Sequence, residues 1–365
     1  MLLRVGVWLL LPQSFESPFM SPRFHLFSQW FATLTSAFFW AVFGVFQGFS
    51  EERFAFEKAE MGLPVRVTLY APDEKTASAA ADAAFARLEA LNAVFTDYDS
   101  DSELSRLSDS SGQGRAVAVS PELWRVMEYA QRISERSGGA FDMSVGAVVN
   151  LWRTARRKKE LPQPERIADA LARSGYDGVR LDRTRRTVEL IKPRMRLDAG
   201  GIAKGHMLEE ALKVLARLGF PRAMVSGGGD MALGDAPLGE SGWRVEIIAL
   251  DAAGAPVPVR FRLCNCSMST SGDLYQRLEI GGKRYSHIVD PKTGIGLTDH
   301  SQVTVVAGRG MEADALSKVV AVLGPEAGFA IIEETPGAAC RVVRAPGDKV
   351  EEKVSRRWGT LEQAP

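Results

Sequence analysis

Residues 197–205, with the sequence LDAGGIAKG, combine an acid, two adjacent glycines and a lysine. They join an extended run, Met195 to Asp198, to an amphipathic segment that is predicted to be helical from Ile202 to Leu218. Glycines at a strand-to-helix turn let the backbone approach a ligand, and the N–H groups at the start of a helix favour an anion. Lys204 adds a positive charge in the first helical turn. The stretch therefore indicates either a phosphate-binding turn or a glycine-rich turn that exposes a lysine.

A second glycine-rich run, GGGD at residues 227–230, follows a short predicted strand at 222–226. Another strand follows it instead of a helix, so it lacks the spacing of a dinucleotide-binding fingerprint. Gly228 and Asp230 belong either to a tight bend or to a backbone cradle around a ligand. Asp142 and Asp198 are lone acids in predicted loops, where turn formation is the alternative to ligand binding.

His287 lies in the run SHIVDP at residues 286–291, and Asp290 follows it by three positions. A histidine beside a carboxylate and held by a turn suits a general base, and a structural histidine is the alternative. Glu312 and Asp314 begin a predicted helix, where carboxylates complement the helix dipole. The functional alternative for these acids is a ligand for a hard cation such as Mg²⁺, which needs few protein ligands besides phosphate oxygens.

The elements around these residues predict an α+β fold, because runs of strands are interrupted by helices without regular β-α alternation. Alternating apolar residues predict strands at 54–58 and 64–70, and strand-like runs between 243 and 280 predict an antiparallel meander. Ser102 and Ser120 are predicted helix caps. Further predicted elements are helices at 74–92, 121–137, 163–174, 312–323 and 325–334, a hairpin of 178–181 with 187–191, and strands at 301–307 and 339–344.

The chain has 365 residues, and its 45 basic and 45 acidic side chains leave no net charge that would attract nucleic acid. The basic run RTARRKK at residues 153–159 is interpreted as a solvated helix face or loop. Three cysteines do not make a disulfide framework or a zinc site. Residues 346–365 are expected to form a polar, disordered tail.

Residues 1–50 are predicted to be a leader. The section 30–49 is apolar, rich in aromatic residues and long enough to cross the hydrocarbon layer of a bilayer. Basic residues, among them Arg23, precede it, and the positive-inside rule then puts the rest of the chain on the far side. Small residues at 48 and 50 also suit a signal-peptide cleavage site. We expect export to the periplasm or the extracytoplasmic face of the inner membrane, with the leader either cleaved or kept as an anchor.

A series of short blocks in chain order resembles the ApbE family, the FAD:protein FMN transferases. Each block is modest by itself, and their order over residues 54–332 makes the resemblance specific. The blocks are MG (61–62), SELSRL (102–107), FD with VG (141–146), LDAGGIAKG (197–205), GGD (228–230), STSG (269–272), SHIVDP with TG (286–294) and EADAL (312–316). The resemblance implies that residues 51–345 form a two-lobed fold with antiparallel sheets and flanking helices, and that FAD binds between the lobes.

The resemblance also implies an enzyme that splits FAD with Mg²⁺, passes FMN to a Thr or Ser hydroxyl of a partner flavoprotein and releases AMP. Lys204 and His287 would be catalytic, with His287 as the base that deprotonates the acceptor hydroxyl. The implied FAD-binding residues are Met61, Asp142, Asp198, Gly201, Lys204, Gly228, Asp230 and His287. The implied metal ligands are the Gly201 carbonyl and the Asp314 carboxylate, with Ser317 as a further candidate.

The chain departs from the family at one position, because Lys318 stands where the family has Thr one helical turn after the metal-binding Asp. Asp314 and Lys318 share a helix face and can pair. A protonated lysine cannot bind a cation. Three possibilities stay open: the metal takes other ligands such as Ser317, Lys318 replaces part of the metal's charge, or the chain binds FAD and transfers FMN poorly.

Two other functions are compatible with the same site. One is a FAD pyrophosphatase, in which water replaces the acceptor hydroxyl and gives FMN and AMP. The other is a non-catalytic FAD-binding accessory protein of a membrane redox complex. The chain contains no Thr-Gly-Ala-Thr-like segment, so the acceptor is expected to be a separate flavoprotein subunit of such a complex.

Overall fold

The centre of the fold is an eight-stranded sheet in which every neighbouring pair of strands is antiparallel. The computed structural model describes residues 51–250, 256–272, 277–345 and 350–363, so the predicted leader at 1–50 lies outside the described residues. Residues from Glu51 onward form one compact unit. In spatial order the strands are β1 (Glu52–Glu60), β2 (Leu63–Ala71), β6 (Ala223–Gly227), β7 (Asp230–Leu233), β10 (Cys266–Gly272), β13 (His300–Ala307), β14 (Ala339–Ala345) and β15 (Glu351–Val354).

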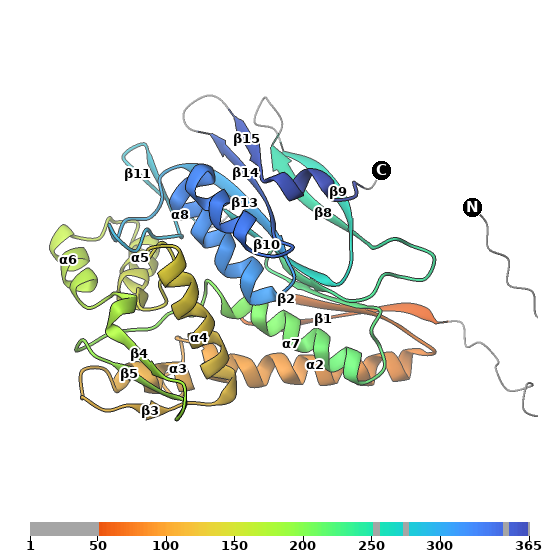
Figure 1. Ribbon diagram of the computed structural model, residues 1–365, viewed down its shortest axis with the longest axis horizontal. Helices are drawn as coiled ribbons and strands as arrows, with labels where there is room; N and C mark the ends of the chain where they lie inside the picture. The colour runs from red at the N-terminus through yellow and green to blue at the C-terminus, as the bar shows by residue number, and fades with distance from the viewer. Residues whose placement is uncertain (1–50, 251–255, 273–276, 346–349, 364–365) are drawn as a thin grey trace, which may run out of the picture. The chain divides into compact units, whose positions relative to one another are not determined.

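Three helices cover one face of this sheet: α2 (Glu74–Phe95), α7 (Ala203–Arg217) and α8 (Gly310–Glu334) (Figure 1). The alternation read from the sequence explains the packing, since Val65, Val67 and Leu69 of β2 are fully buried in the core that these helices share. Burial of each such side chain contributes about 1.5–3 kcal/mol. The two helices predicted at 312–323 and 325–334 form α8, which kinks at Gly324 before a proline.

By length and composition alone α8 could cross a membrane, but half of it is buried against β10 and β13, so it is the core helix of this layer.

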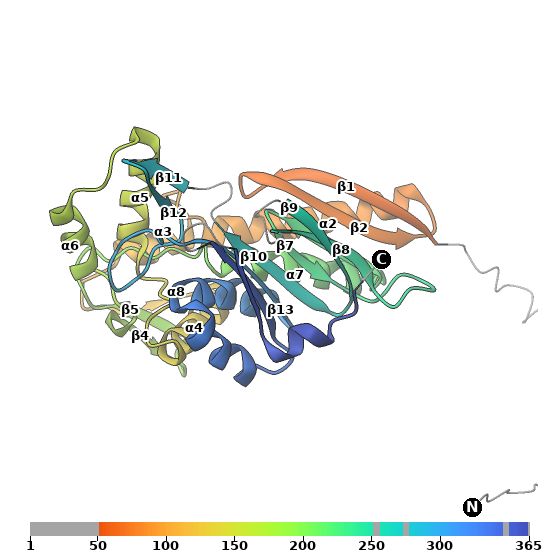
Figure 2. The same cartoon turned by 90° about the horizontal axis from the view of Figure 1, so that it is seen from above.

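A hairpin of β8 (Trp243–Leu250) and β9 (Pro256–Leu263) packs on the opposite face of the sheet (Figure 2). Its core contains Trp243 and Phe261 with residues of the main sheet such as Met268. The meander predicted between residues 243 and 280 is confirmed for the β8–β9 pair and wrong for the later strands. Its strands belong to three sheets, because β10 inserts between β7 and β13 while β11 (Arg277–Ile280) pairs with β12 (Lys283–Ser286). Local strand patterns cannot specify which partner a strand takes across the molecule.

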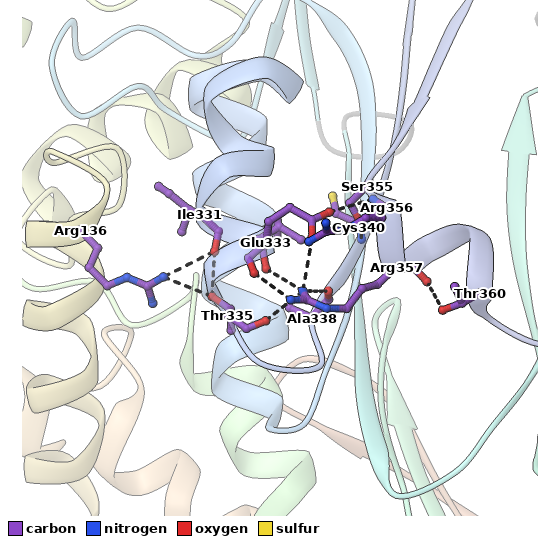
Figure 3. Close-up of polar contacts among 11 residues, drawn as sticks. Arg136, Ile331, Glu333, Thr335, Ala338, Cys340, Ser355, Arg356, Arg357 and Thr360 are labelled. Carbon is purple, nitrogen blue, oxygen red and sulfur yellow. Dashed lines mark hydrogen bonds and ion pairs between the residues drawn. The ribbon is translucent and has the colours of Figure 1, made fainter.

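The predicted disordered tail is also wrong over residues 351–360. Strand β15 extends the main sheet, and the 3-10 helix η2 (Arg356–Thr360) buries Trp358 against Phe261, with ring centroids 5.2 Å apart. Arg357 donates hydrogen bonds to carbonyl oxygens at the end of α8 and just beyond it, among them that of Ala338 at 2.9 Å (Figure 3). The prediction rested on the polar composition of the segment. It did not take into account that Trp358 is buried and that Arg357 donates to carbonyl groups at the end of a helix.

A smaller group of elements gathers at one end of the sheet (Figure 1). Helices α3 and α4 begin where the sequence predicts, since Ser102 and Ser120 each accept a hydrogen bond from a backbone N–H in the first helical turn. Trp152 and Val289 belong to a separate hydrophobic cluster there. The elements are α3 (Glu103–Asp109), β3 (Val117–Ala118), α4 (Pro121–Arg136), α5 (Gly146–Lys158), α6 (Pro164–Ala172), η1 (Tyr176–Gly178), β4 (Val179–Asp182), β5 (Thr187–Leu190), β11 and β12. The predicted α+β class with antiparallel sheets and flanking helices is confirmed.

Candidate active site

The two parts of the fold meet at a pocket of about 670 Å³, a volume typical of cofactor and small-molecule sites. Residues from the β10–α8 side and from the α5 side both line it. The predicted site residues that line the pocket are Asp142, Asp198, Gly201, Lys204, Gly228 and His287. Tertiary structure thus gathers residues that are spread from Asp142 to His287 along the chain.

The glycine turn of residues 197–205 ends where α7 and α8 meet. A Cβ at Gly205 would lie 2.2 Å from the carbonyl oxygen of Gly310, so the close approach needs glycine. Asp314 of α8 accepts a hydrogen bond from the Gly205 N–H at 3.0 Å, and Glu209 of α7 accepts one from the Gly310 N–H at 2.8 Å. Neither helix has a cap of its own, so each helix caps the other with a carboxylate.

Lys204 joins this turn to the second glycine run. Its ammonium lies 2.8 Å from the carboxylate of Asp230 and donates to the Gly228 carbonyl at 3.3 Å. Gly228 has a φ of 58°, which the tight turn between β6 and β7 requires. Burial alone would lower the pKa of Lys204, and the nearby carboxylates of Asp230 and Asp314 outweigh it, so the pKa lies above its usual value. The lysine is therefore a cation in the pocket wall.

The loop around Asp142 runs beside the start of the glycine turn. The Asp198 N–H donates to the Met143 carbonyl at 2.7 Å, and the Gly146 N–H donates to the Arg196 carbonyl at 3.0 Å. Asp142 accepts a hydrogen bond from the Ser144 N–H at 2.7 Å, and its burial raises its pKa. Asp142 therefore shapes its turn and also lines the pocket, while ligand binding by this acid stays a prediction.

Asp198 is bound on two sides. Its carboxylate accepts a hydrogen bond from the Gly200 N–H at 2.7 Å and forms an ion pair with Arg153 at 2.8 Å. Arg153 also pairs with Asp97, and it lines the pocket. The interpretation of residues 153–159 as a solvated face is therefore wrong for Arg153. Its spacing of four residues from Val149, which lines the same pocket, was the available signal.

His287 reaches the pocket from the loop after β12, where it is partly buried. Trp152 of α5 fixes this loop, since its indole N–H donates to the Gly294 carbonyl at 2.8 Å. Asp290 accepts hydrogen bonds from the Lys292 N–H at 2.9 Å and the Thr293 hydroxyl at 3.2 Å. The carboxylate three residues after the histidine thus holds the turn that carries it.

The residues expected to bind Mg²⁺ do not present an open set of ligands. One oxygen of Asp314 accepts from the Gly205 N–H, and the other pairs with the ammonium of Lys318. The Ser317 hydroxyl donates to the Asp314 carbonyl at 2.7 Å and lies 2.7 Å from the Ser271 hydroxyl. Within the described residues no three His, Cys, Asp or Glu side chains group as a metal site. The donor set as it lies does not fit the metal.

Four predicted residues lie outside the pocket lining. Met61 sits at the β1–β2 turn, and the nearby Leu63 lines the pocket instead. Asp230, Asp314 and Ser317 are buried behind the wall that Lys204 and Lys318 form.

Tyr98 also lines the pocket, although it was not predicted as a site residue. The guanidinium carbon of Arg153 lies over its exposed ring, 4.6 Å from the ring centroid. A lone tyrosine in a polar turn gives no signal of its own.

One pocket thus brings together the Lys204 ammonium at the glycine turn, the His287 imidazole and apolar side chains such as Phe141. The model of the ApbE family matches residues 61–342, which is most of the chain, so the chain belongs to the ApbE family. It is 32% identical to the FAD:protein FMN transferase of Haemophilus influenzae, covering 70% of this chain and 76% of that one, and 33% identical to that of Treponema pallidum, covering 71% and 75%. It is also similar in structure to the flavin transferase ApbE from Vibrio cholerae, with a TM-score of 0.76 and 27% identity over 85% of this chain and 99% of that one.

Proposed function

We propose that this protein is a FAD:protein FMN transferase, an enzyme that moves FMN from FAD to a Thr or Ser hydroxyl of a partner flavoprotein and releases AMP. The observation that carries the proposal is that one pocket joins the Lys204 ammonium at a glycine turn to the His287 imidazole. The first suits a diphosphate, and the second suits a base for a hydroxyl. The names of the relatives support the same activity.

The remaining pocket wall suits a flavin. Phe141, Val145, Val149 and Ile288 supply apolar surface beside the polar turn. An isoalloxazine ring is large, flat and mostly apolar, so it gains from burial there while the diphosphate lies toward Lys204.

The proposed reaction is a phosphoryl transfer. The acceptor oxygen attacks the phosphorus of the FMN half, and the bond from that phosphorus to the bridging oxygen breaks. AMP leaves with the bridging oxygen and its electron pair. The hydroxyl proton passes to His287, and Lys204 offsets the negative charge that grows on the phosphate oxygens. The family resemblance implies a Mg²⁺ requirement, but the Asp314 carboxylate that would bind the ion pairs with Lys318 instead.

The partner and the location are part of the proposal. The acceptor would be a flavoprotein subunit of a membrane redox complex, and the enzyme would be exported, with residues 1–50 as a signal peptide or anchor. The apolar section at 30–49 supports this. Fractionation of cells that express the full chain tests it, and a cytoplasmic enzyme with an intact residue 1–50 segment would contradict it.

The experiment incubates the full chain with FAD and a protein that carries a Thr-Gly-Ala-Thr segment, with and without Mg²⁺. Fluorescent FMN covalently bound to the acceptor, with one AMP released per FMN, is the expected result. Free FMN with AMP would instead identify a pyrophosphatase, and unchanged FAD would identify a binding protein. His287→Gln should retain FAD binding and lose transfer, since the residue acts on the acceptor and not on the diphosphate.

A further inference from the structure

Lys318 stands in the pocket wall at the place where its own helix would otherwise offer a free carboxylate oxygen. Its side chain is 15% exposed, its ammonium pairs with Asp314, and it also donates to the Ser317 hydroxyl at 3.3 Å. A Cβ at Gly201 would lie 3.6 Å from the Lys318 Cγ, so the lysine stem packs on the glycine turn. The ammonium is held at the turn that the diphosphate would approach.

Lys204, Lys318, Asp230 and Asp314 form a cluster in which two positive charges balance two negative charges. The Lys204–Asp230 and Lys318–Asp314 pairs each join one ammonium to one fully buried carboxylate. The carboxylates lie behind the pocket wall, whereas both lysines line the pocket. Each ammonium has three donors, and each lysine gives only part of this capacity to its carboxylate.

A divalent cation would fit this arrangement poorly. To reach Asp314 it must displace the Lys318 ammonium, because the other oxygen of that carboxylate already accepts the Gly205 N–H. Two positive groups within a few ångströms repel each other strongly where little water screens them.

We propose that the Lys318 ammonium takes the place of a divalent metal ion in this protein, so that Lys318 and Lys204 together bind the diphosphate of FAD without Mg²⁺. This inference rests on the proposed function, since it concerns the same flavin site. It makes Lys318 a substrate-binding residue for the diphosphate, and it makes Asp314 the residue that positions its ammonium.

The test measures FAD binding to the full chain by flavin fluorescence, once in EDTA and once in Mg²⁺. We expect the wild-type affinity to change less than about threefold between the two conditions. Lys318→Thr should lower the affinity in EDTA on the order of tenfold to a hundredfold, because it removes one charge-assisted contact, and Mg²⁺ should restore most of it. Lys75→Thr, an exposed lysine in the first turn of α2, is the control that removes one charge away from the pocket.

A second readout follows the metal itself. By electron paramagnetic resonance, Mn²⁺ should bind the FAD complex of Lys318→Thr and not that of the wild type. Lys318→Arg, which keeps the charge, should bind FAD in EDTA, and the recovery of FAD binding by Lys318→Thr in Mg²⁺ shows that the Thr variant is folded. FAD binding by the wild type that requires Mg²⁺, or one bound Mn²⁺ per wild-type chain, would overturn the inference and leave the proposed function standing. A wild-type chain that binds no FAD in either condition would overturn both.

Discussion

The two halves of helix α7 each carry a cluster of buried carboxylates and basic side chains, and only one of them opens to the pocket. Near the start, Lys204 reaches Asp230 and lines the pocket. Less than two turns along, Glu210 is 5% exposed and receives Arg87 at 3.1 Å and Lys213 at 3.0 Å, away from the pocket. Both clusters perturb the pKa values of their members.

The carboxylates are buried in both clusters, so the difference lies in whether the basic side chains paired with them line the pocket. At the pocket, Asp230 and Asp314 are buried behind Lys204 and Lys318, so this part of the wall offers ammonium groups to a ligand. At Glu210 the basic side chains do not line the pocket. The carboxylate forms ion pairs with Arg87 of α2 and Lys213 of α7 and stabilises the packing of these two helices. A perturbed pKa by itself therefore does not identify a functional group in this protein; access to a pocket does.

The largest effect is expected for Lys204→Met. It leaves Asp230 buried without its ion-pair partner, which costs about 3–5 kcal/mol of unfolding free energy. It should also abolish measurable FAD binding. Lys213→Met is the matched variant in the other cluster, and its lysine is 46% exposed, so we expect a small stability change and normal FAD affinity. Denaturant unfolding and fluorescence titration measure both, and weakened FAD binding in Lys213→Met would break the comparison.

Glu210→Gln should lower stability without touching the flavin. Burial raises the pKa of Glu210, but hydrogen bonds from Lys213 and Arg87 outweigh it and set the pKa to about 2. Because the folded-state pKa is depressed, the ionised carboxylate contributes about 3 kcal/mol at neutral pH, and this is lost as pH falls from 4.5 toward 2. Unfolding measured from pH 7 to pH 2 should show this fall in the wild type only. An equal fall in the Gln variant would assign it to another group.

His206→Leu is expected to give the smallest effect, and it acts only in acid. His206 is fully buried beside Phe95, and within the described residues neither ring nitrogen has a hydrogen-bond partner. Burial lowers its pKa to about 4, although Glu210 and Glu209 oppose this. In the unfolded chain His206 takes up a proton near pH 6.5, whereas in the folded chain it stays neutral until about pH 4. The free energy of unfolding therefore falls as pH drops from 6.5 toward 4.

At pH 5 this amounts to about 2 kcal/mol, which the Leu variant should not lose. Thermal unfolding at pH 7 and pH 5 compares the two proteins. The comparison of the two clusters would be sharpened if FAD affinity of the variant stays at the wild-type value at both pH values. A pH-dependent loss of stability equal to that of the wild type would show that His206 is not its source.

The sequence identified the residues of the pocket better than it identified their partners. Lys204, Asp142, Asp198 and His287 stand in local patterns of glycine, acid and turn residues, which are visible without a structure. Lys318 was visible as a departure from the family pattern and as a possible partner of Asp314. Arg153 was not identified, because a basic helix face looks the same whether it meets solvent or a buried carboxylate from another element.

What the sequence alone determined is the α+β class, the strands and helices with their caps, and the chemistry of each block, because periodicity, capping and turn chemistry act over a few residues. Only the tertiary structure decided that strand β10 inserts into the main sheet, that Trp358 anchors the C-terminal segment and that α7 and α8 cap each other through Gly205 and Gly310. These depend on burial or on contacts between residues that lie tens of positions to about a hundred positions apart in the chain. A local sequence pattern specifies neither of these. Lys318 could therefore be identified in the sequence, but the structure was needed to show that it pairs with the expected metal ligand Asp314.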